Sequence, residues 1–302
     1  MHPISPVRAQ ILDGKSLSKR IREEELKPRV KRLREKGIVP RLDVFVSADD
    51  PASQAYVRMK QKRGEQIGII GSAYPLTKET TQNWLLQKIL ELNADPTVHG
   101  VLIQHPLPKH LNEAEALEAL GAEKDVDGIT PQSLGRLFAG MRGFRCATPL
   151  GMMRLLDEYK IPCEGKRAVV VGRSIILGKP SAMMLLERNA TVTICHSKTQ
   201  NLQDICREAD ILVAAVGRAE MIRGEWIKPG AVVLDAGYNK VEGRDGDVGD
   251  VHFESAVQVA SYITPVPGGV GPMTVAMLLS NVVEAAEKEP KSTTRSHRSV
   301  SL

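Results

Sequence analysis

The sequence predicts an α/β protein with mainly parallel sheets. Short runs rich in β-branched and other apolar residues alternate with helical patterns along most of the 302 residues. Such alternation is typical of parallel strands joined by helices that cover the sheet. The length exceeds that of an ordinary single domain and is sufficient for two. We therefore expect two three-layer α/β domains.

The strand candidates fall into two groups. In the first half of the chain they are apolar runs bounded by turn residues, and in the second half they recur at the spacing of βαβ units. We expect strands at 42–47, 68–76, 98–104, 167–172, 191–197, 210–217 and 231–237.

Three helix starts are marked by capping residues. Asp50 is an N-cap type residue, and the proline that follows it suits the first helical position. Asn112 has Glu115 three residues later, which is the spacing of a capping box, and this helix should stop near Gly121. A third helix is expected to begin at Thr148, which also precedes a proline.

A domain boundary is expected near residue 150. The segment 121–150 is rich in loops, glycine and proline, and a strand, a glycine-containing turn, a helix and a second strand follow it. We assign residues 1–150 to the first domain and 151–271 to the second. The final helix, 272–288, should return to the first domain, and the Ser/Thr-rich segment 289–302 should be a disordered tail.

Composition argues against several functions. The net charge is +5, but the last twelve residues contain three basic residues and no acid, so the high pI is weak evidence for nucleic-acid binding. The sequence has no apolar run of eighteen residues and no apolar signal core, which favours a cytoplasmic protein without a membrane span. The four cysteines lack metal-ligand spacing, so we expect no metal.

One predicted helix carries three chemically distinct side chains on a single face. Ser53, Tyr56 and Lys60 stand at offsets of 0, 3 and 7, and residues at these offsets lie along one side of an α-helix. This pattern is compatible with a solvated face that contains a partly buried tyrosine.

The second domain contains a candidate phosphate-binding turn. The segment 169–186 predicts a strand, a turn with Gly172 and Gly178, and then a helix, with Arg173 and Ser174 inside the turn. Glycines allow the backbone to approach a ligand closely, and a helix N-terminus offers free N–H groups to a phosphate. The predicted fold of this domain is therefore Rossmann-like.

The next strand points to NADP rather than NAD. Sites for NAD usually have a carboxylate at the end of the second strand to hold the ribose hydroxyls. Here the strand ends in Cys195 and is followed by His196, Ser197 and Lys198, without an acid. Together with Arg173 these groups suit an additional phosphate. The alternative is that they are ordinary surface residues.

Two later strands end in residues that suit the same crevice. Gly217 ends the strand at 210–217, where a nicotinamide or its ribose could lie against the backbone. Asn239 closes the segment 234–239, "LDAGYN", one strand later. We assign both residues to the cofactor site.

Several longer motifs accompany these residues. They are "GVLIQHPLP" (100–108), "KDVDGITPQSLGRL" (124–137), "ATPLG" (147–151) and "ITPVPGGVGPMTVAMLL" (263–279), beside "VVGRSIILGKP" and "ATVTICHSKT". From about residue 10 to 287 the chain resembles the bifunctional methylenetetrahydrofolate dehydrogenase/methenyltetrahydrofolate cyclohydrolase family. The resemblance implies NADP-dependent oxidation of methylenetetrahydrofolate, hydrolysis of the methenyl product to formyltetrahydrofolate, and one folate pocket in a cleft between the domains.

The resemblance also implies roles for individual residues. Tyr56 would stack on the folate, Lys60 would be the central catalytic group, Gln104 would position Lys60, and Asp127 would hold the edge of the pterin. Of the two acids in "DVDG", Asp125 would only brace the loop.

The resemblance extends to residues that bind substrate and cofactor and to the quaternary structure. Arg173, Ser174 and Ser197 would hold the NADP phosphates, and we place Thr148 at the cofactor site. Ser53 could contact the substrate or could be an ordinary first-turn residue. The chain is expected to pair as a homodimer through the nucleotide domain. The folate side of the cleft would be walled by the loop 265–272, which includes Pro267, Gly268, Gly269 and Pro272.

Two positions depart from the family pattern. His105 follows Gln104 where relatives usually have a leucine, and Ala147 stands at the usual position of a thiol. These changes leave open an alternative, a dehydrogenase with weak or absent cyclohydrolase activity. A protein that binds folate or nucleotide without turnover is a further alternative, against which the retained Lys60, Gln104 and Asp127 argue.

Overall fold

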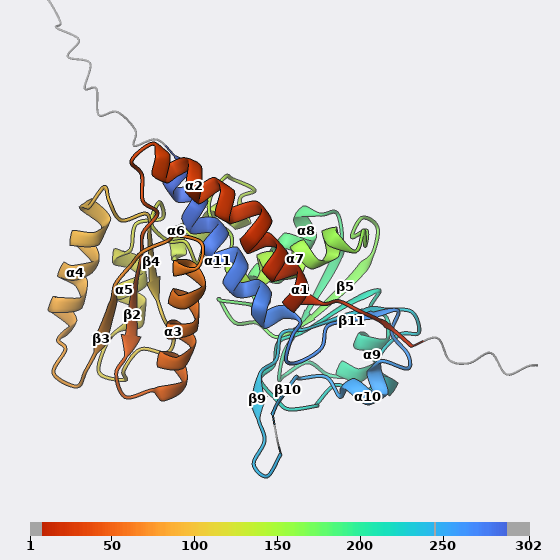
Figure 1. The fold of residues 1–302 in the computed structure, drawn as a ribbon. Helices are drawn as coiled ribbons and strands as arrows, with labels where there is room; N and C mark the ends of the chain where they lie inside the picture. The colour runs from red at the N-terminus through yellow and green to blue at the C-terminus, as the bar shows by residue number, and fades with distance from the viewer. Residues whose placement is uncertain (1–7, 245, 289–302) are drawn as a thin grey trace, which may run out of the picture.

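The computed structural model describes residues 8–244 and 246–288, and it confirms the predicted α/β class (Figure 1). Two parallel sheets dominate, one of six strands in the order β1-β11-β8-β7-β5-β6 and one of three in the order β3-β2-β4. Strands β9 and β10 form a separate antiparallel pair. The strands are β1 Gln10–Ile11, β2 Leu42–Ser47, β3 Ala73–Leu76, β4 Gly100–Ile103, β5 Arg167–Val171, β6 Thr191–Cys195, β7 Ile211–Ala214, β8 Val232–Asp235, β9 Asn239–Lys240, β10 Asp247–Val248 and β11 Tyr262–Ile263.

Helices connect and cover these strands. The predicted tail, 289–302, lies outside the described residues. Within the described part of the chain, no helix is both long enough and apolar enough to cross a bilayer. The helices are α1 Gly14–Arg20, the π-helix η1 Ile21–Leu26, α2 Lys27–Glu35, α3 Pro51–Glu65, α4 Gln82–Ala94, α5 Glu113–Ala119, α6 Pro131–Phe138, α7 Ala147–Glu158, α8 Gly178–Glu187, α9 Leu202–Arg207, the 3₁₀ helix η2 Gly224–Trp226, α10 Phe253–Ala256 and α11 Val270–Glu287.

The three-stranded sheet is buried on both faces. Successive side chains of a strand point to opposite faces, so Val44 and Val46 of β2 belong to one apolar cluster and Phe45 to another. The first cluster contains residues of α3 and α11, and the second contains residues of α4 and α5. The sheet is therefore the middle layer between two layers of helices, as the sequence predicts.

The six-stranded sheet is covered in the same way. Val170 of β5 packs with residues of α7, α8 and α11, whereas Val169 and Val171 face a cluster that includes residues of α9 and α10. All of its strand pairs are parallel. The carboxyl ends of β5, β6, β7 and β8 therefore lie along one edge of this sheet, where a doubly wound fold binds its ligand.

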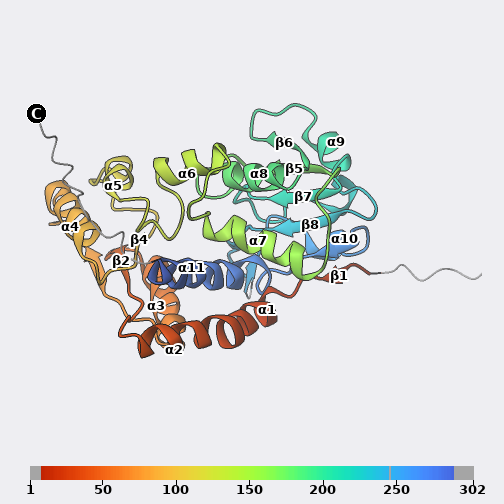
Figure 2. The same ribbon diagram turned by 90° about the horizontal axis from the view of Figure 1, so that it is seen from above.

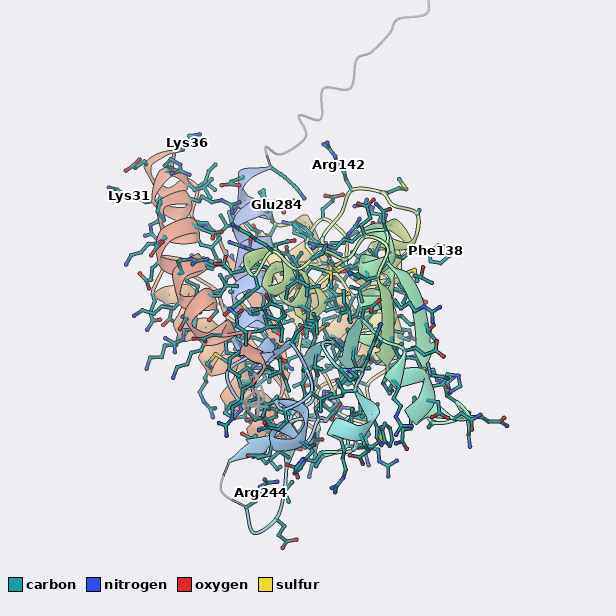
Figure 3. The ribbon with its side chains drawn as sticks, turned by 90° about the vertical axis from the view of Figure 1, so that its right-hand side faces the viewer. Lys31, Lys36, Phe138, Arg142, Arg244 and Glu284 are labelled. Carbon is teal, nitrogen blue, oxygen red and sulfur yellow. The ribbon has the colours of Figure 1, made fainter. Side chains whose placement is uncertain are left out.

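The first forty residues contain elements that the sequence analysis did not predict. Strand β1 pairs with β11 at the edge of the six-stranded sheet, and α1, η1 and α2 then run past α11 toward the three-stranded sheet (Figures 1 and 2). A two-residue strand carries no recognisable period. On α2, Val30 and Leu33 are buried and Lys31 points outward (Figure 3).

Helix α11 ties the two sheets together. It contacts α7 and α1 most extensively, and it also contacts α3 and β4 (Figure 2). Its Asn281 is 3% exposed and donates hydrogen bonds to the carbonyls of Val126, at 2.8 Å, and Arg145, at 3.1 Å. A buried amide that satisfies two loop carbonyls fixes the segment around Asp127 against this helix.

The predicted strands and caps are mostly confirmed, with local corrections. The strand expected at 68–76 is shorter, because Gly68 has φ +92° and belongs to the turn after α3. Asp50 and Asn112 cap their helices as expected. Glu115 binds the Asn112 side-chain amide rather than its backbone N–H. The helix expected at Thr148 begins at Ala147.

Candidate active site

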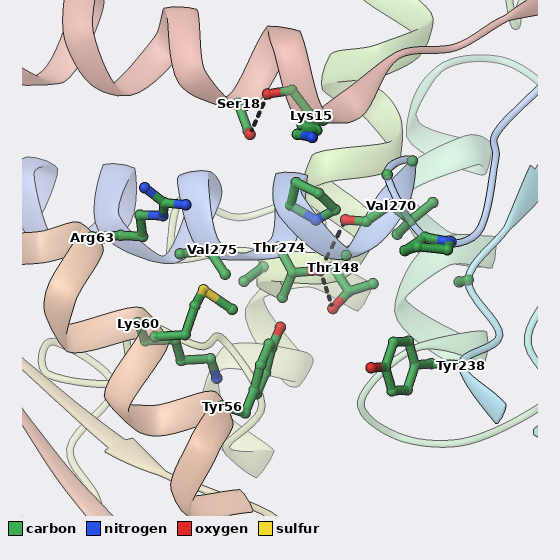
Figure 4. A pocket seen from close by; sticks show the side chains of 18 of the residues that line it. Lys15, Ser18, Tyr56, Lys60, Arg63, Thr148, Tyr238, Val270, Thr274 and Val275 are labelled. Carbon is green, nitrogen blue, oxygen red and sulfur yellow. Dashed lines mark hydrogen bonds between the residues drawn. The ribbon is translucent and has the colours of Figure 1, made fainter. Parts of the chain in front are cut away.

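A cavity of about 1400 Å³ lies between the two sheets (Figure 4). Its walls come from α1, η1, α3, the end of β4, the start of α7, the loop 265–272 and the segment 235–240. Of the residues predicted for catalysis and substrate binding, all line this cavity: Ser53, Tyr56, Lys60, Gln104, Asp127, Pro267, Gly268, Gly269 and Pro272.

Lys60 is a buried basic side chain in the wall of this cavity. Only 4% of its surface is exposed. Its Nζ donates to Gln104 Oε1 at 2.9 Å and lies 4.4 Å from the centroid of the Tyr56 ring. Helix α3 places Tyr56 and Lys60 one turn apart on the same face, and Gln104 directly follows β4. The amine is thus held between an aromatic face and an amide oxygen. Figure 4 shows Lys60 beside the Tyr56 ring.

The surroundings shift the pKa values of Lys60 and Asp127. Burial lowers the pKa of Lys60 to about 8, and the negative charge of Asp127 opposes this shift. Burial also raises the pKa of Asp127, against the influence of Lys60. A lysine with a pKa near 8 is present in both protonation states around neutral pH, which suits general acid–base catalysis.

The two acids of the "DVDG" motif have different surroundings. Asp125 is fully buried and accepts hydrogen bonds from the backbone N–H groups of Gly128, at 2.9 Å, and Thr130, at 2.8 Å. It therefore braces the loop, as expected. Asp127 lines the cavity, and no hydrogen bond to its carboxylate occurs among the described residues. Its oxygens remain available to a ligand.

Ser53 is part of the helix cap. Its hydroxyl donates to the carboxylate of Asp50 at 2.6 Å, and only 7% of the residue is exposed. The Ser53 hydroxyl therefore donates its hydrogen bond within the first turn of α3. The residue also borders the cavity.

The loop 265–272 is held in place by the N-terminal helix. The backbone N–H of Lys15 donates to the Gly268 carbonyl at 2.8 Å. A Cβ atom on Gly14 would lie 1.8 Å from the Gly269 carbonyl oxygen, so only glycine allows α1 to pack this closely on the loop. Gly268 itself has φ +116°, which strongly favours glycine.

Thr148 lies where α7 meets α11. The hydroxyl of Thr274 donates to Thr148 Oγ1 at 3.0 Å, and both residues line the cavity (Figure 4). Thr148 therefore lies in the wall of the cavity between Lys60 and the six-stranded sheet.

The predicted phosphate-binding turn is compact. Gly172 has φ +139°, and a Cβ atom there would lie 2.2 Å from the Ala215 carbonyl oxygen. A Cβ atom on Gly178 would lie 2.3 Å from the carbonyl oxygen of Gly172. These close contacts leave Arg173 and Ser174 exposed on the turn.

The basic and hydroxyl groups expected to select NADP lie on neighbouring loops. Val171 of β5 pairs with Cys195 of β6, and Arg173 and Ser197 each follow two residues later. His196 is partly buried, and its backbone N–H donates to Thr199 Oγ1 at 2.9 Å, which closes the turn after β6. Neither Arg173 nor Ser197 has a side-chain hydrogen-bond partner within the part of the chain described here.

Gly217 and Asn239 are joined through an acid that the sequence analysis missed. The fully buried carboxylate of Asp250 accepts from the backbone N–H of Gly217, at 3.0 Å, and from the Asn239 amide, at 2.9 Å. Asp250 thus shapes the loop after β7. The expected cofactor residues 172–174, 196, 197, 217 and 239 border the carboxyl edge of the sheet and do not line the cavity, whose lining in this region is Ile176, Leu177, residues 235–238 and Lys240.

Comparisons with known proteins agree with this arrangement. Residues 12–127 match the profile described as the tetrahydrofolate dehydrogenase/cyclohydrolase catalytic domain. Residues 146–290 match the NAD(P)-binding domain of the same family. The chain belongs to the tetrahydrofolate dehydrogenase/cyclohydrolase family.

Individual relatives cover nearly the whole chain. The bifunctional protein FolD of Moorella thermoacetica is 55% identical over 280 residues, which is 93% of this chain and 99% of that protein. The crystal structure of the FolD dehydrogenase/cyclohydrolase of Campylobacter jejuni has a TM-score of 0.90 at 48% identity, and covers 92% of this chain and 98% of its own. The Trypanosoma brucei enzyme, solved with NADP cofactor and an inhibitor, has a TM-score of 0.88 at 38% identity, over 92% and 97%.

In this member of the family, His105 follows Gln104, whose side-chain amide accepts from Lys60. His105 Nδ1 lies 2.7 Å from Glu113 Oε1, and its Nε2 is buried without a hydrogen-bond partner among the described residues. Gln104 donates to the His105 carbonyl at 3.0 Å. The pair with Glu113 therefore anchors the segment that holds Gln104. Ala147 is fully buried at the start of α7.

Several basic residues that line the cavity were missed by the sequence analysis. Lys15, Lys19 and Arg22 stand at offsets of 0, 4 and 7, and Arg63 lies seven residues after Tyr56. The same spacing rule that drew attention to Tyr56 and Lys60 would have found both rows. No group of three or more His, Cys, Asp or Glu side chains suited to a metal occurs in the described ranges.

Replacing Lys60 by methionine should stabilise the fold. The folded-state pKa, about 8, is below the ordinary value of 10.5. Below pH 8 the amine is charged in both states, so the folded protein carries the full cost of burying it. This cost corresponds to at most about 3 kcal/mol, at 1.36 kcal/mol per pKa unit. The cost disappears as the pH rises from 8 toward 10.5.

Thermal or denaturant unfolding of Lys60→Met at several pH values measures this effect. We expect a gain in unfolding free energy at pH 7 that shrinks above pH 8. Lys62→Met, which changes an exposed lysine of the same helix, is the control and should change little. A destabilised Lys60→Met protein at pH 7 would contradict the burial argument.

Proposed function

We propose that this protein is a bifunctional enzyme of one-carbon metabolism. It oxidises methylenetetrahydrofolate with NADP and hydrolyses the methenyl product to formyltetrahydrofolate. The observation that carries this proposal is the buried Lys60 amine, held by Gln104 and Tyr56 in a cavity that extends to the nucleotide-binding sheet. Relatives that share about half of its residues are named as bifunctional proteins.

The cavity suits a flat, partly charged ring system. Tyr56 presents its ring face to the site and lies beside the amine. The free carboxylate of Asp127 matches the adjacent N–H donors at the edge of a pterin, much as a carboxylate pairs with a guanidinium. These two groups orient the substrate so that its one-carbon unit lies near Lys60.

The oxidation step depends mainly on positioning. NADP, when bound, accepts a hydride from the methylene carbon of the substrate. Loss of the hydride leaves a resonance-stabilised cation that spans two nitrogens. The face of Tyr56 stabilises this flat cation by stacking and by cation–π attraction. The loop 265–272 and α1 close one side of the cavity and limit the access of water.

The hydrolysis step requires proton transfers, and Lys60 is placed to carry them. Water adds to the cationic carbon and must lose a proton, which neutral Lys60 accepts. The C–N bond to one ring nitrogen then breaks, the ammonium form of Lys60 returns the proton to that nitrogen, and the hydroxyl on the carbon loses its proton to solvent as the formyl C=O bond forms. A pKa of about 8 allows both roles near neutral pH. Gln104 fixes the position of Nζ during the cycle.

The cofactor groups favour NADP over NAD. Residues 196–199, which follow β6, contain a histidine, a serine, a lysine and a threonine but no carboxylate. Arg173 is exposed on the adjacent loop. This set of donors fits the additional phosphate of NADP, and no acid is present at that point to bind the ribose hydroxyls of NAD.

We further propose that the enzyme is a homodimer that associates through the nucleotide domain. Strand β6 is the edge strand of the six-stranded sheet, so one side of its backbone has no strand partner among the described residues. Ile194 in this strand is 38% exposed and Leu186 of α8 is 54% exposed. A second copy of this chain would cover both the open edge and these apolar side chains.

Lys60→Met should abolish the hydrolysis step. We expect hydrolysis of methenyltetrahydrofolate, measured by the loss of its absorbance without nucleotide, to fall by at least about 100-fold, because the proton acceptor is lost. Circular dichroism confirms folding, and Lys62→Met should hydrolyse at the normal rate. If Lys60→Met retained normal hydrolysis, the amine would have no part in that step.

Replacing Arg173 and Ser197 together by alanine should weaken NADP binding selectively. We expect the KM for NADP to rise about tenfold or more, because charge-assisted hydrogen bonds to the phosphate are lost. The KM for NAD should change little. Arg167→Ala, which removes a cation at the opposite end of β5, serves as the control. Equal changes for both nucleotides would place the phosphate elsewhere.

Ile194→Glu should weaken the proposed dimer. A charge in the covered face would have to be desolvated, so sedimentation or light scattering should show a lower mass at a given concentration. Leu90→Glu, which changes a 56% exposed residue of α4, should leave the mass unchanged. A wild-type protein that is monomeric at micromolar concentration would refute the proposal.

A further inference from the structure

A largely buried arginine of the cavity has no acidic partner among the described residues. Arg22 lies in η1, lines the cavity, and is only 7% exposed. Among residues 8–244 and 246–288, no hydrogen bond or ion pair to its guanidinium occurs. The guanidinium opens onto the cavity, and a charge that is largely removed from water is stabilised by an anion, so the arrangement indicates that a ligand supplies one.

A second guanidinium lies close to the first. Burial lowers the pKa of Arg22, and the positive charge of Arg63 lowers it further. Arg63 is half-buried on α3 and also lines the cavity. The only hydrogen bond found for it in the described structure is donated to the Gln66 side chain, which is neutral. Two arginines that line the same cavity, neither with an ion pair among the described residues, form a site for an anion.

The surrounding charges strengthen this conclusion. Lys15 and Lys19 of α1 line the same wall. The one carboxylate on this wall, that of Glu23, already accepts from Lys27 at 3.2 Å. The wall formed by α1 and η1 therefore has an excess of positive charge that other residues of the described chain do not neutralise.

The two arginines lie away from Tyr56 and from the nucleotide-binding sheet. Arg63 follows Lys60 by three residues and Tyr56 by seven, which places it about 10 Å beyond Tyr56 along the axis of α3. In Figure 4, Arg63 lies on the side of Lys60 that is farther from Tyr238 of the nucleotide domain. The two guanidiniums are therefore at the end of the cavity opposite the cofactor.

We propose that Arg22 and Arg63 form a carboxylate subsite that binds the tail of the tetrahydrofolate substrate. This inference rests on the proposed function. Tetrahydrofolate continues from its pterin through an aminobenzoyl group to a glutamate with two carboxylates. With the pterin at Asp127 and the one-carbon unit at Lys60, the tail extends away from the nucleotide sheet. Guanidinium groups bind carboxylates through paired hydrogen bonds.

The subsite would contribute to binding rather than to the chemical step. The tail carboxylates do not change charge during oxidation or hydrolysis, so their contacts stabilise the ground state and the transition state equally. Removal of one arginine should therefore raise KM and leave kcat nearly unchanged. Lys15 and Lys19 are exposed at the rim and should contribute less than the two arginines.

The test compares two substrates in the full-length protein. One is methylenetetrahydrofolate, and the other is methylenetetrahydropteroate, which lacks the glutamate. For Arg63→Gln and for Arg22→Gln we expect the KM for the folate to rise about tenfold or more, while the KM for the pteroate and both kcat values stay close to wild type. Arg63→Lys should recover part of the affinity, and Lys62→Gln is the matched control.

The outcomes separate the subsite from the proposed function. If the wild-type protein turns over neither substrate, the proposed function fails. If it turns over both, and the arginine variants raise both KM values equally or neither, the subsite is refuted. Equal wild-type KM values for the two substrates would also refute it, since the tail would then make no contact. Arg22→Gln changes a buried group, so its melting temperature is measured, and Arg63→Gln keeps the test decisive if it fails to fold.

Discussion

The buried amine of Lys60 is the constraint on which the cavity depends. A cation that is almost fully buried is tolerated only if the surrounding groups compensate for lost hydration. Here the compensation comes from the Gln104 oxygen, the face of Tyr56 and the charge of Asp127, and it is incomplete, as the lowered pKa shows. Three separate segments must meet for this, so α3, the end of β4 and the "DVDG" loop have to be held together with little freedom.

Helix α11 and its neighbours provide that rigidity. Asn281 secures the loop that carries Asp127, and Thr274 joins α11 to the start of α7. The same helix begins at the loop 265–272, which α1 holds from the other side through the contacts of Gly14 and Lys15. A single long element thus connects the groups around Lys60 to the end of the cavity near the six-stranded sheet. The geometry around Lys60 therefore depends on contacts between residues far apart in sequence.

Charged groups lie on both sides of Lys60. Basic and hydroxyl groups on the loops after β5 and β6 lie outside the cavity and suit the phosphates of a dinucleotide, while Arg22 and Arg63 offer positive charge within the cavity. The carboxylate of Asp127 lies between them. A substrate with a neutral donor edge at one end and carboxylates at the other can bind in only one direction, since the reverse orientation would place its carboxylates against Asp127. Electrostatics would in this way fix the orientation as well as the affinity.

The sequence by itself determined the α/β class, all seven main strands, the caps at Asp50 and Asn112, and the group of residues around Lys60. The strands and caps have local causes, namely hydrophobic period and capping chemistry, and Ser53, Tyr56 and Lys60 share one helix face at offsets of 0, 3 and 7. Gln104 and Asp127 were indicated by the family resemblance of longer motifs. The tertiary structure alone decided that β1 joins the distant β11, that α1 and η1 form a wall of the cavity, and that Arg22 is buried there without an ion pair among the described residues. Such features arise because packing brings together segments that carry no mutual signal in the sequence. Burial, which sets both the pKa of Lys60 and the cost of an unpaired guanidinium, exists only after that packing has formed.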